Sequence, residues 1–197
     1  MIYAILGPTG CGKTTLIEKI VEKYGYYPIY EEWMNNPYIK EAYQHSNHKF
    51  DNQQWFIRND IERTIRAIDK SNINSVVIDK LFIQNYVYVE YDTFSIAEKK
   101  VLFALLDAKL HLLNSIDTII SFKIPTEEIS RRIRNRKRDF ETSISNEWIS
   151  KFNGGIDLIV EHLSAKYPNI KIYKYNEHNE FIDENGDIVG ENKIFNV

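Results

Sequence analysis

The stretch AILGPTGCGKTT, residues 4–15, lies between an apolar run at Ile2–Leu6 and a segment with helical periodicity. Residues 7–14 match the phosphate-binding pattern G-x-x-x-x-G-K-S/T. Its glycines let backbone N–H groups turn toward phosphate oxygens, and the N-terminus of the next helix adds positive potential. Lys13 would reach the β- and γ-phosphates, and the Thr14 hydroxyl would ligate Mg²⁺. The pattern therefore predicts a nucleoside triphosphate site formed by Gly7, Pro8, Thr9, Gly10, Cys11, Gly12, Lys13, Thr14 and Thr15.

Composition is that of a folded globular protein. Of the 197 residues, 43% are hydrophobic and 13% aromatic, which is enough to bury a substantial core in one domain. The formal net charge of −3 argues against a non-specific nucleic-acid binder. Cys11 is the only cysteine, which excludes an internal disulfide and favours a reducing compartment. The sequence shows neither a basic leader nor an apolar run of membrane-spanning length, so we expect a cytoplasmic protein without a membrane partner.

Apolar periodicity predicts strands that alternate with helices. The expected strands are Ile2–Leu6, Tyr27–Tyr30, Ser75–Ile78, Thr118–Ile124 and Ile170–Tyr175. Long helices are expected over Phe50–Lys70, Ser95–Leu113 and Asn146–Lys166. This alternation predicts an α/β fold with a parallel five-stranded sheet, helices on both faces and one nucleotide-binding domain over residues 1–175. Residues 176–197 carry Asn185-Gly186 between short apolar runs, which predicts a β-hairpin appendage.

Acidic residues follow two of the expected strands. Asp79 ends the buried run SVVID, where a second carboxylate associated with Mg²⁺ is expected in a fold of this kind. Lys80 beside it would face either a phosphate or solvent. Glu31 and Glu32 follow the second strand, and either carboxylate could accept a proton from an attacking hydroxyl. On these residues alone, an ordinary charged loop explains the pair equally well.

The segment RRIRNRKR, residues 131–138, is strongly basic. The segment could form a solvated helix face with i,i+4 ion pairs, or a patch that binds nucleic acid. However, Arg132 and Arg136, like Arg134 and Arg138, stand four residues apart, so two columns of guanidinium groups can line one face. Phosphoryl transfer needs such charge around the equatorial oxygens, which favours an arginine-rich lid over the triphosphate.

Taken in order, these segments resemble the deoxynucleoside kinase family, of the deoxycytidine, deoxyadenosine and deoxyguanosine kinase type. The family's Glu-Pro-Val and Asn-Pro-aromatic segments correspond to EEWMNNPY, residues 31–38. Its Phe-x-x-Gln-x-x-Phe segment corresponds to FDNQQWF, residues 50–56. Its Asp/Glu-Arg-Ser signature falls on residues 79–81, and its lid pattern Arg-Ile-x-x-Arg-x-Arg-x-x-Glu falls on residues 132–141. The resemblance covers roughly residues 1–175.

The resemblance implies ATP-dependent phosphorylation of a deoxyribonucleoside 5′-hydroxyl, with Mg²⁺ as cofactor and a possible homodimer through the long helices. It implies a catalytic set of Glu31, Lys13, Lys80, Arg132 and Arg136, with Arg138 also at the donor and Thr14 and Asp79 at the metal. The implied substrate-binding residues are Trp33, Tyr43, Gln53, Phe56, Asn85 and Glu141. The chain departs from the family at Lys80-Leu81 in place of Arg-Ser, at Glu32-Trp33 in place of Pro-Val, and at Asn85, where an aspartate is common.

Two other functions compete with this interpretation. A thymidylate kinase-like enzyme shares the loop and the lid, and it would need arginines for the phosphate of its acceptor, which Arg58, Arg63 and Arg66 could supply. Glu31, Tyr43 and Gln53 fit a nucleoside acceptor better. A nucleotide-binding module that acts on a partner such as RNA is disfavoured by the net negative charge.

Overall fold

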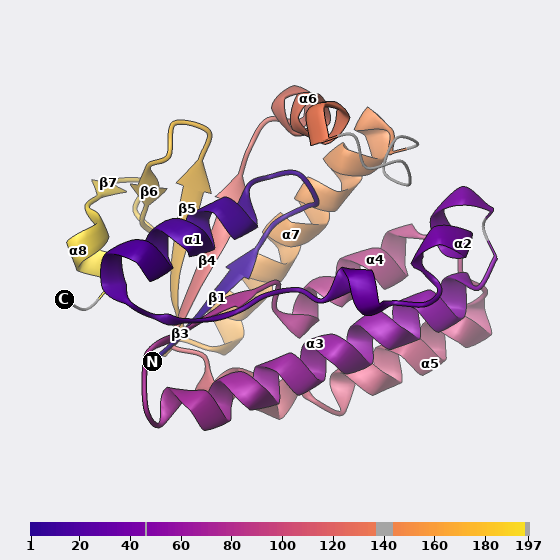
Figure 1. Ribbon diagram of the computed structural model, residues 1–197, viewed down its shortest axis with the longest axis horizontal. Helices are drawn as coiled ribbons and strands as arrows, with labels where there is room; N and C mark the ends of the chain where they lie inside the picture. The colour runs from indigo at the N-terminus through magenta and orange to yellow at the C-terminus, as the bar shows by residue number, and fades with distance from the viewer. Residues whose placement is uncertain (46, 137–143, 196–197) are drawn as a thin grey trace.

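The computed structural model describes residues 1–45, 47–136 and 144–195 (Figure 1). Its strands are β1 (Ile2–Leu6), β2 (Tyr27–Ile29), β3 (Val76–Asp79), β4 (Thr118–Lys123), β5 (Lys171–Asn176), β6 (Phe181–Ile182) and β7 (Ile188–Val189). Its α-helices are α1 (Lys13–Tyr24), α2 (Ile39–Gln44), α3 (Lys49–Ser71), α4 (Asn85–Tyr91), α5 (Ile96–Asp107), α6 (Thr126–Arg136), α7 (Asn146–Lys166) and α8 (Glu191–Ile194). Short 3-10 turns cover Trp33–Asn35, Phe82–Gln84 and Leu110–Ser115.

The strands form one sheet in the order β2-β3-β1-β4-β5-β6-β7. The first five pair in parallel, as the alternation of strands and helices predicts. The sheet has seven strands in the described residues rather than five, because the C-terminal hairpin pairs with the edge of β5. Lys174 pairs with Ile182, and Tyr175 pairs with Phe181. The hairpin thus covers backbone groups of a strand that would otherwise form an exposed edge.

Local signals explain some of the element boundaries. Ser95 caps α5 in a reciprocal capping box with Glu98, as the sequence predicts. That helix ends at Asp107 instead of Leu113, and the chain continues as the 3-10 turn. In the hairpin, Gly186 has φ +87°, a conformation that glycine adopts without strain.

Both faces of the sheet are covered, and β1 and β3 are buried along their whole length. Side chains at alternate positions of β1, such as Ala4 and Leu6, pack with α3, α4, α5 and α7. Tyr3 and Ile5 point to the other face, against α1, α6 and the C-terminal segment. No helix in the described ranges is long and apolar enough to span a membrane. The parallel strands all end at one edge of the sheet, where a crevice is expected in open α/β sheets.

Candidate active site

The loop after β1 has the backbone conformation that its glycines allow. Gly10 has φ +83°, and Gly12, the residue before α1, has φ +111°. A Cβ atom built on Gly10 would lie 2.6 Å from Cγ1 of Ile133, which belongs to α6. Packing of α6 against the loop therefore requires glycine at this position for two separate reasons, the positive φ and the close approach.

Replacement of Gly10 by alanine is expected to weaken binding of the triphosphate at this loop more than binding of the molecule that receives the phosphate. The new methyl group would push against Ile133, and the strained backbone would displace the N–H groups that face the phosphates. We expect KM for ATP to rise about tenfold, corresponding to about 1.4 kcal/mol, with a smaller change in KM for the acceptor. Steady-state kinetics with each substrate varied in turn measures both values. A larger effect on acceptor KM than on ATP KM would contradict this account. Gly154→Ala is a matched control, because a Cβ there would have no neighbour within 4 Å in the described part of the chain.

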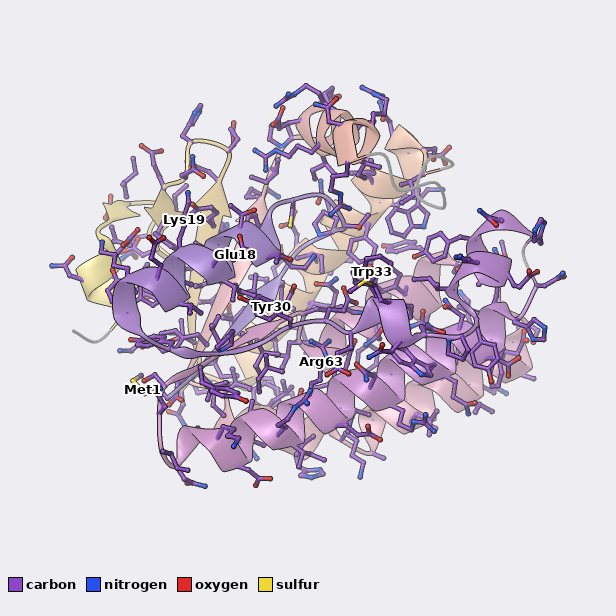
Figure 2. All side chains as sticks on the ribbon, in the orientation of Figure 1. Met1, Glu18, Lys19, Tyr30, Trp33 and Arg63 are labelled. Carbon is purple, nitrogen blue, oxygen red and sulfur yellow. The ribbon has the colours of Figure 1, made fainter. Side chains whose placement is uncertain are left out.

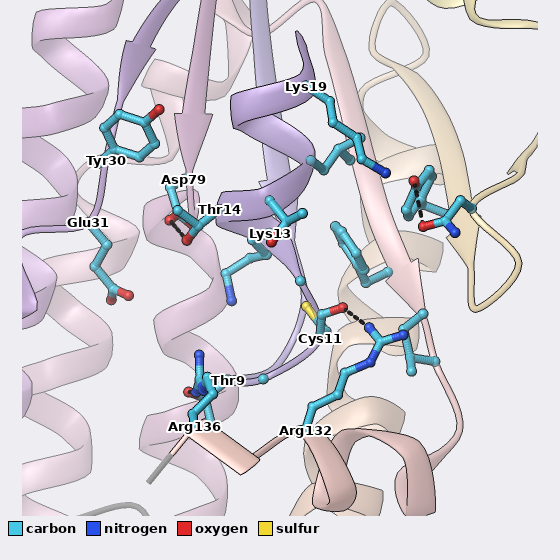
Figure 3. Close-up of a pocket in the computed structure, with 18 of the residues that line it drawn as sticks. Thr9, Cys11, Lys13, Thr14, Lys19, Tyr30, Glu31, Asp79, Arg132 and Arg136 are labelled. Atoms are coloured by element: carbon cyan, nitrogen blue, oxygen red, sulfur yellow. Dashed lines mark hydrogen bonds between the residues drawn. The ribbon is translucent and has the colours of Figure 1, made fainter. Parts of the chain in front are cut away.

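Cations surround the loop (Figure 3). The Lys13 ammonium donates to the carbonyl oxygens of Gly7 and Pro8, both at 3.0 Å. From α6, Arg132 Nη1 donates to the Cys11 carbonyl at 2.6 Å and Arg136 Nη2 donates to the Thr9 hydroxyl at 3.0 Å. Arg132 and Arg136 therefore lie directly on the loop, whereas Arg134, the third lid arginine that the structure describes, donates to the Ser130 hydroxyl at 3.1 Å within α6. Arg138 and Glu141 lie outside the described residues.

Thr14 and Asp79 are brought together as the sequence predicts. The Thr14 hydroxyl donates to Asp79 Oδ2 at 3.1 Å (Figure 3). Asp79 Oδ1 is buried and has no hydrogen-bond partner among the residues that the structure describes, so one carboxylate oxygen is available as a ligand. Burial raises the pKa of Asp79, although the charge of Lys13 opposes this effect. A hydroxyl beside a carboxylate oxygen is the donor set that Mg²⁺ prefers next to substrate phosphates. The residues present therefore fit the expected ion. Within the described ranges, no three acidic, histidine or cysteine side chains form a metal cluster by themselves.

Two adjoining cavities occupy the carboxyl edge of the sheet. The first, of about 520 Å³, is lined by loop residues 9–16 together with Asp79, Arg132 and Arg136, and we call it the donor cavity. The second, of about 410 Å³, lies between α2, α3 and the start of α7, and we call it the acceptor cavity. Thr9, Glu31 and Trp33 line both cavities. Glu31 therefore stands where two bound substrates would meet.

Glu31 and Glu32 are neighbours in sequence, but their side chains have different surroundings in the structure. Glu31 Oε1 accepts a hydrogen bond from Lys80 Nζ at 2.9 Å. Burial alone would raise the pKa of Glu31, but the positive charges of Lys80, Arg63 and Lys13 outweigh burial and lower it to about 2. Glu31 is therefore ionised at neutral pH. Glu32 lines neither cavity and instead pairs with Arg66 at 2.9 Å on the surface.

Of the predicted substrate residues that the structure describes, all but Asn85 reach the acceptor cavity. Trp33, Tyr43, Gln53 and Phe56 line its wall, and Lys80 lines it beside Glu31. The Lys80 ammonium stands 4.4 Å from the centre of the Phe56 ring. Asn85 is fully buried behind the wall, and its Oδ1 accepts a hydrogen bond from Gln53 Nε2 at 3.0 Å. Asn85 therefore contacts the side chain expected to read the base without lining the cavity itself.

The helix arginines that a monophosphate acceptor would need lie elsewhere. Arg63 is fully buried and points from α3 toward the end of β3 (Figure 2), where its Nη1 donates to the Asp79 carbonyl at 2.5 Å. Arg66 pairs with Glu32, and the exposed Arg58 lies 3.8 Å from Glu62. None of the three lines the acceptor cavity as formed by the described residues.

Several residues that line the cavities belong to no recognisable sequence motif. In the acceptor cavity these include Ile39, Asn52, Tyr88, Asp92, Ser145 and Trp148. In the donor cavity they include Lys19, Phe122, Ile124, Tyr175, Asn176 and Asn179. Asn179 lies in the turn that joins β5 to the hairpin, and its Oδ1 accepts from the Tyr175 hydroxyl at 3.1 Å. A strand-end position is the only sequence signal that could have indicated Tyr175 and Asn176.

The sequence is similar to those of known proteins. The family model described as deoxynucleoside kinase matches residues 3–195. A deoxyguanosine kinase of Bacillus subtilis (strain 168) is 26% identical over 175 residues, which cover 86% of this chain and 83% of the relative. A deoxyguanosine kinase of Dictyostelium discoideum is 24% identical over 182 residues, covering 89% of this chain. The match spans only 64% of the length of the Dictyostelium protein.

Solved structures agree in fold. A deoxyadenosine kinase from M. mycoides, with the products dCMP and a flexible dCDP bound, has a TM-score of 0.75 and 20% identity. That match covers 87% of this chain and 89% of the other. The structure of deoxyadenosine kinase from M. mycoides with bound dATP has a TM-score of 0.71 and 22% identity, covering 87% and 90% of the two chains. With the family model matching nearly the whole length, this chain belongs to the deoxynucleoside kinase family of nucleoside-phosphorylating enzymes.

Proposed function

We propose that the protein transfers the γ-phosphoryl group of ATP to the 5′-hydroxyl of a deoxyribonucleoside. The observation that carries this proposal is the position of Glu31, an ionised carboxylate in the wall shared by a phosphate-binding cavity and a cavity lined by aromatic and amide side chains. A nucleoside in the acceptor cavity can direct its sugar hydroxyl at Glu31, with its base beside Gln53 and Phe56. ATP in the donor cavity would present its γ-phosphate to the same point.

The transfer follows from these positions. Glu31 accepts the hydroxyl proton while the 5′-oxygen forms a bond to the γ-phosphorus and the bond to the bridging oxygen of ADP breaks. Lys13, Arg132 and Arg136 surround the phosphates and stabilise their charge. Thr14 and Asp79 would hold Mg²⁺, which supplies further charge neutralisation when bound. The low pKa of Glu31 suits a loose transition state, in which the acceptor loses its proton late.

The experiment that tests this function offers labelled ATP with each of the four deoxynucleosides and each of their monophosphates. We expect label on one or more deoxynucleosides, with rates on the monophosphates at least about 10²-fold lower, because the described acceptor cavity contains no arginine to hold a second phosphate. Label that appears only on monophosphates would establish the thymidylate kinase-like alternative. Label on neither, together with salt-sensitive RNA binding, would point to the partner-binding module.

We also propose that the enzyme is a cytoplasmic homodimer. Exposed apolar side chains on α3 and α5 support the dimer, namely Ile65, Ile96, Val101 and Leu105. These two helices lie side by side on the outer layer of the molecule (Figure 1). Packing such an apolar face against a second copy would remove it from water. The single buried thiol of Cys11 fits the reducing cytoplasm.

A further inference from the structure

A buried carboxylate lies behind the acceptor cavity. It contacts both Lys80, which binds Glu31, and Asn85, which binds Gln53. Asp60 belongs to α3, is fully buried and lines neither cavity. Three donors converge on its two oxygens. Arg63 Nη2 donates to Oδ1, Asn85 Nδ2 donates to Oδ2 at 2.7 Å, and Lys80 Nζ lies 3.0 Å from Oδ2. Because a buried charge is costly unless it is paired and hydrogen-bonded, these contacts explain how the carboxylate is retained in the core.

Toward the catalytic side, Asp60 binds Lys80, which in turn binds Glu31. The Lys80 ammonium is shared between Asp60 Oδ2 at 3.0 Å and Glu31 Oε1 at 2.9 Å. The Lys80 backbone has φ +69°, which is unfavourable for a residue with a side chain. Arg63, itself bound to Asp60, donates to the carbonyl of Asp79 and reaches the carbonyl of Lys80 at 3.5 Å. Asp60 therefore fixes Lys80 both at its ammonium group and, through Arg63, at its backbone.

On the other side, Asp60 sets the orientation of two amides. An ionised carboxylate only accepts hydrogen bonds, so Asn85 must present its Nδ2 to Asp60. That same Nδ2 donates to the Phe82 carbonyl at 2.9 Å, which leaves Oδ1 to face Gln53. Gln53 must then donate from Nε2 to Asn85, and its amide is fixed in one of two possible orientations at the wall of the acceptor cavity. The charge of Asp60 thus determines which edge of Gln53 meets the base.

We propose that Asp60 is a positioning residue that couples base recognition to phosphoryl transfer, through Asn85 to Gln53 and through Lys80 to Glu31. The proposal rests on the proposed function, since it assumes that a nucleoside occupies the acceptor cavity. Its content is separate: one buried carboxylate, remote from the substrate, controls both the discrimination among bases and the rate of transfer.

The test begins with Asp60→Asn, which keeps the shape and removes the charge. An asparagine offers one acceptor oxygen to three donors, so Lys80 or Asn85 loses its partner. We expect kcat to fall about 10- to 100-fold, as for other small misplacements of catalytic groups. We also expect discrimination to weaken: the ratio of kcat/KM for the best deoxynucleoside to kcat/KM for the worst should fall at least about tenfold. Asp69→Asn is the control, because this aspartate is exposed on the same helix.

A second variant, Asp60→Asn combined with Asn85→Asp, distinguishes the effect on base discrimination from the effect on the rate of transfer. The residue at position 85 can then only accept, so Gln53 keeps its orientation, and the net charge of the buried cluster is unchanged. We expect the discrimination among bases to return toward the wild-type ratio while kcat stays low, because the carboxylate has moved from position 60 to position 85. This variant also decides the matter if Asp60→Asn does not fold.

Each result of these experiments either supports the proposal or overturns it. Restored discrimination with low kcat in the double variant supports the proposal. A folded Asp60→Asn enzyme with wild-type kcat and base ratio would overturn it, as would a double variant with wild-type kcat or without discrimination. A wild-type enzyme that phosphorylates all four deoxynucleosides equally would also contradict a fixed Gln53 amide. In contrast, a wild-type protein that phosphorylates no deoxynucleoside would refute the proposed function, so the two failures are distinguishable.

Discussion

Replacement of Glu31 by glutamine is expected to lower kcat by about 10²- to 10⁴-fold, the range that a general base contributes. Glutamine has nearly the same shape but cannot take the proton of the attacking hydroxyl. Lys80 keeps its contact with Asp60 at 3.0 Å, so the fold around the site should persist. KM for ATP should change by less than about threefold, because the loop and the lid arginines hold the donor without Glu31.

Glu32→Gln is the matched control for this experiment. Glu32 is the next residue, carries the same side chain and pairs with Arg66 at the surface, outside both cavities. We expect its kcat to stay within about twofold of wild type, since surface ion pairs contribute little. Turnover is measured with saturating ATP and nucleoside, and ATP binding by calorimetry. Equal losses in the two variants, or full turnover in Glu31→Gln, would remove Glu31 from the mechanism.

The donor half of the site could be predicted from sequence because its signals are local. The loop residues are contiguous, and Asp79 is identified by its position at the end of a buried strand. The parallel arrangement of the first five strands follows from the alternation with helices. The added pairing of the hairpin with β5 could not be predicted. A hairpin signal specifies a turn between two strands and says nothing about the third strand beside which the pair will lie.

The network behind the acceptor cavity was missed for a different reason. Asp60 and Arg63 stand three residues apart on α3, which in sequence resembles an ordinary surface ion pair of a helix. In the sequence, Arg63 is a candidate ligand only for the phosphate of a monophosphate acceptor. Both side chains are fully buried, because Lys80 and the end of β3 supply partners from a distant part of the chain. Pairing of this kind depends on tertiary packing and has no local pattern.

Replacement of Lys80 by methionine is expected to impair both stability and catalysis. The side chain of Lys80 is 3% exposed and contacts the carboxylates of Glu31 and Asp60. Methionine has a similar length and suffers the same positive φ, so the comparison isolates the charge. Removing one partner of a buried ion pair costs about 3–5 kcal/mol of unfolding free energy. Loss of the cation that holds Glu31 in place should lower kcat about 10²-fold.

The control for stability is Lys151→Met. Lys151 and Glu147 form an ion pair at 2.7 Å with both side chains more than half exposed. We expect that substitution to cost less than about 1 kcal/mol, because exposed pairs are screened by water and salt. Denaturant unfolding at neutral pH measures both variants. Similar costs for Lys80→Met and Lys151→Met would contradict the assignment of Lys80 to a buried charge network.

The pH dependence of Lys80→Met gives a more specific result than its stability. In the wild type the pKa of Glu31 is lowered to about 2, so Glu31 stays ionised and its contribution to kcat/KM is constant between pH 5 and 7. Its folded pKa lies below the unfolded value, so the ionised form also stabilises the protein above about pH 4.3, and this contribution is lost as the pH falls toward 2. Without Lys80, burial is opposed only by more distant cations, and the pKa of Glu31 must rise. The acid limb of kcat/KM should therefore move upward, so that the activity of the variant falls as the pH is lowered from 7 to 5. A variant whose residual activity is as flat as that of the wild type over this interval would show that Lys80 does not set the ionisation of Glu31.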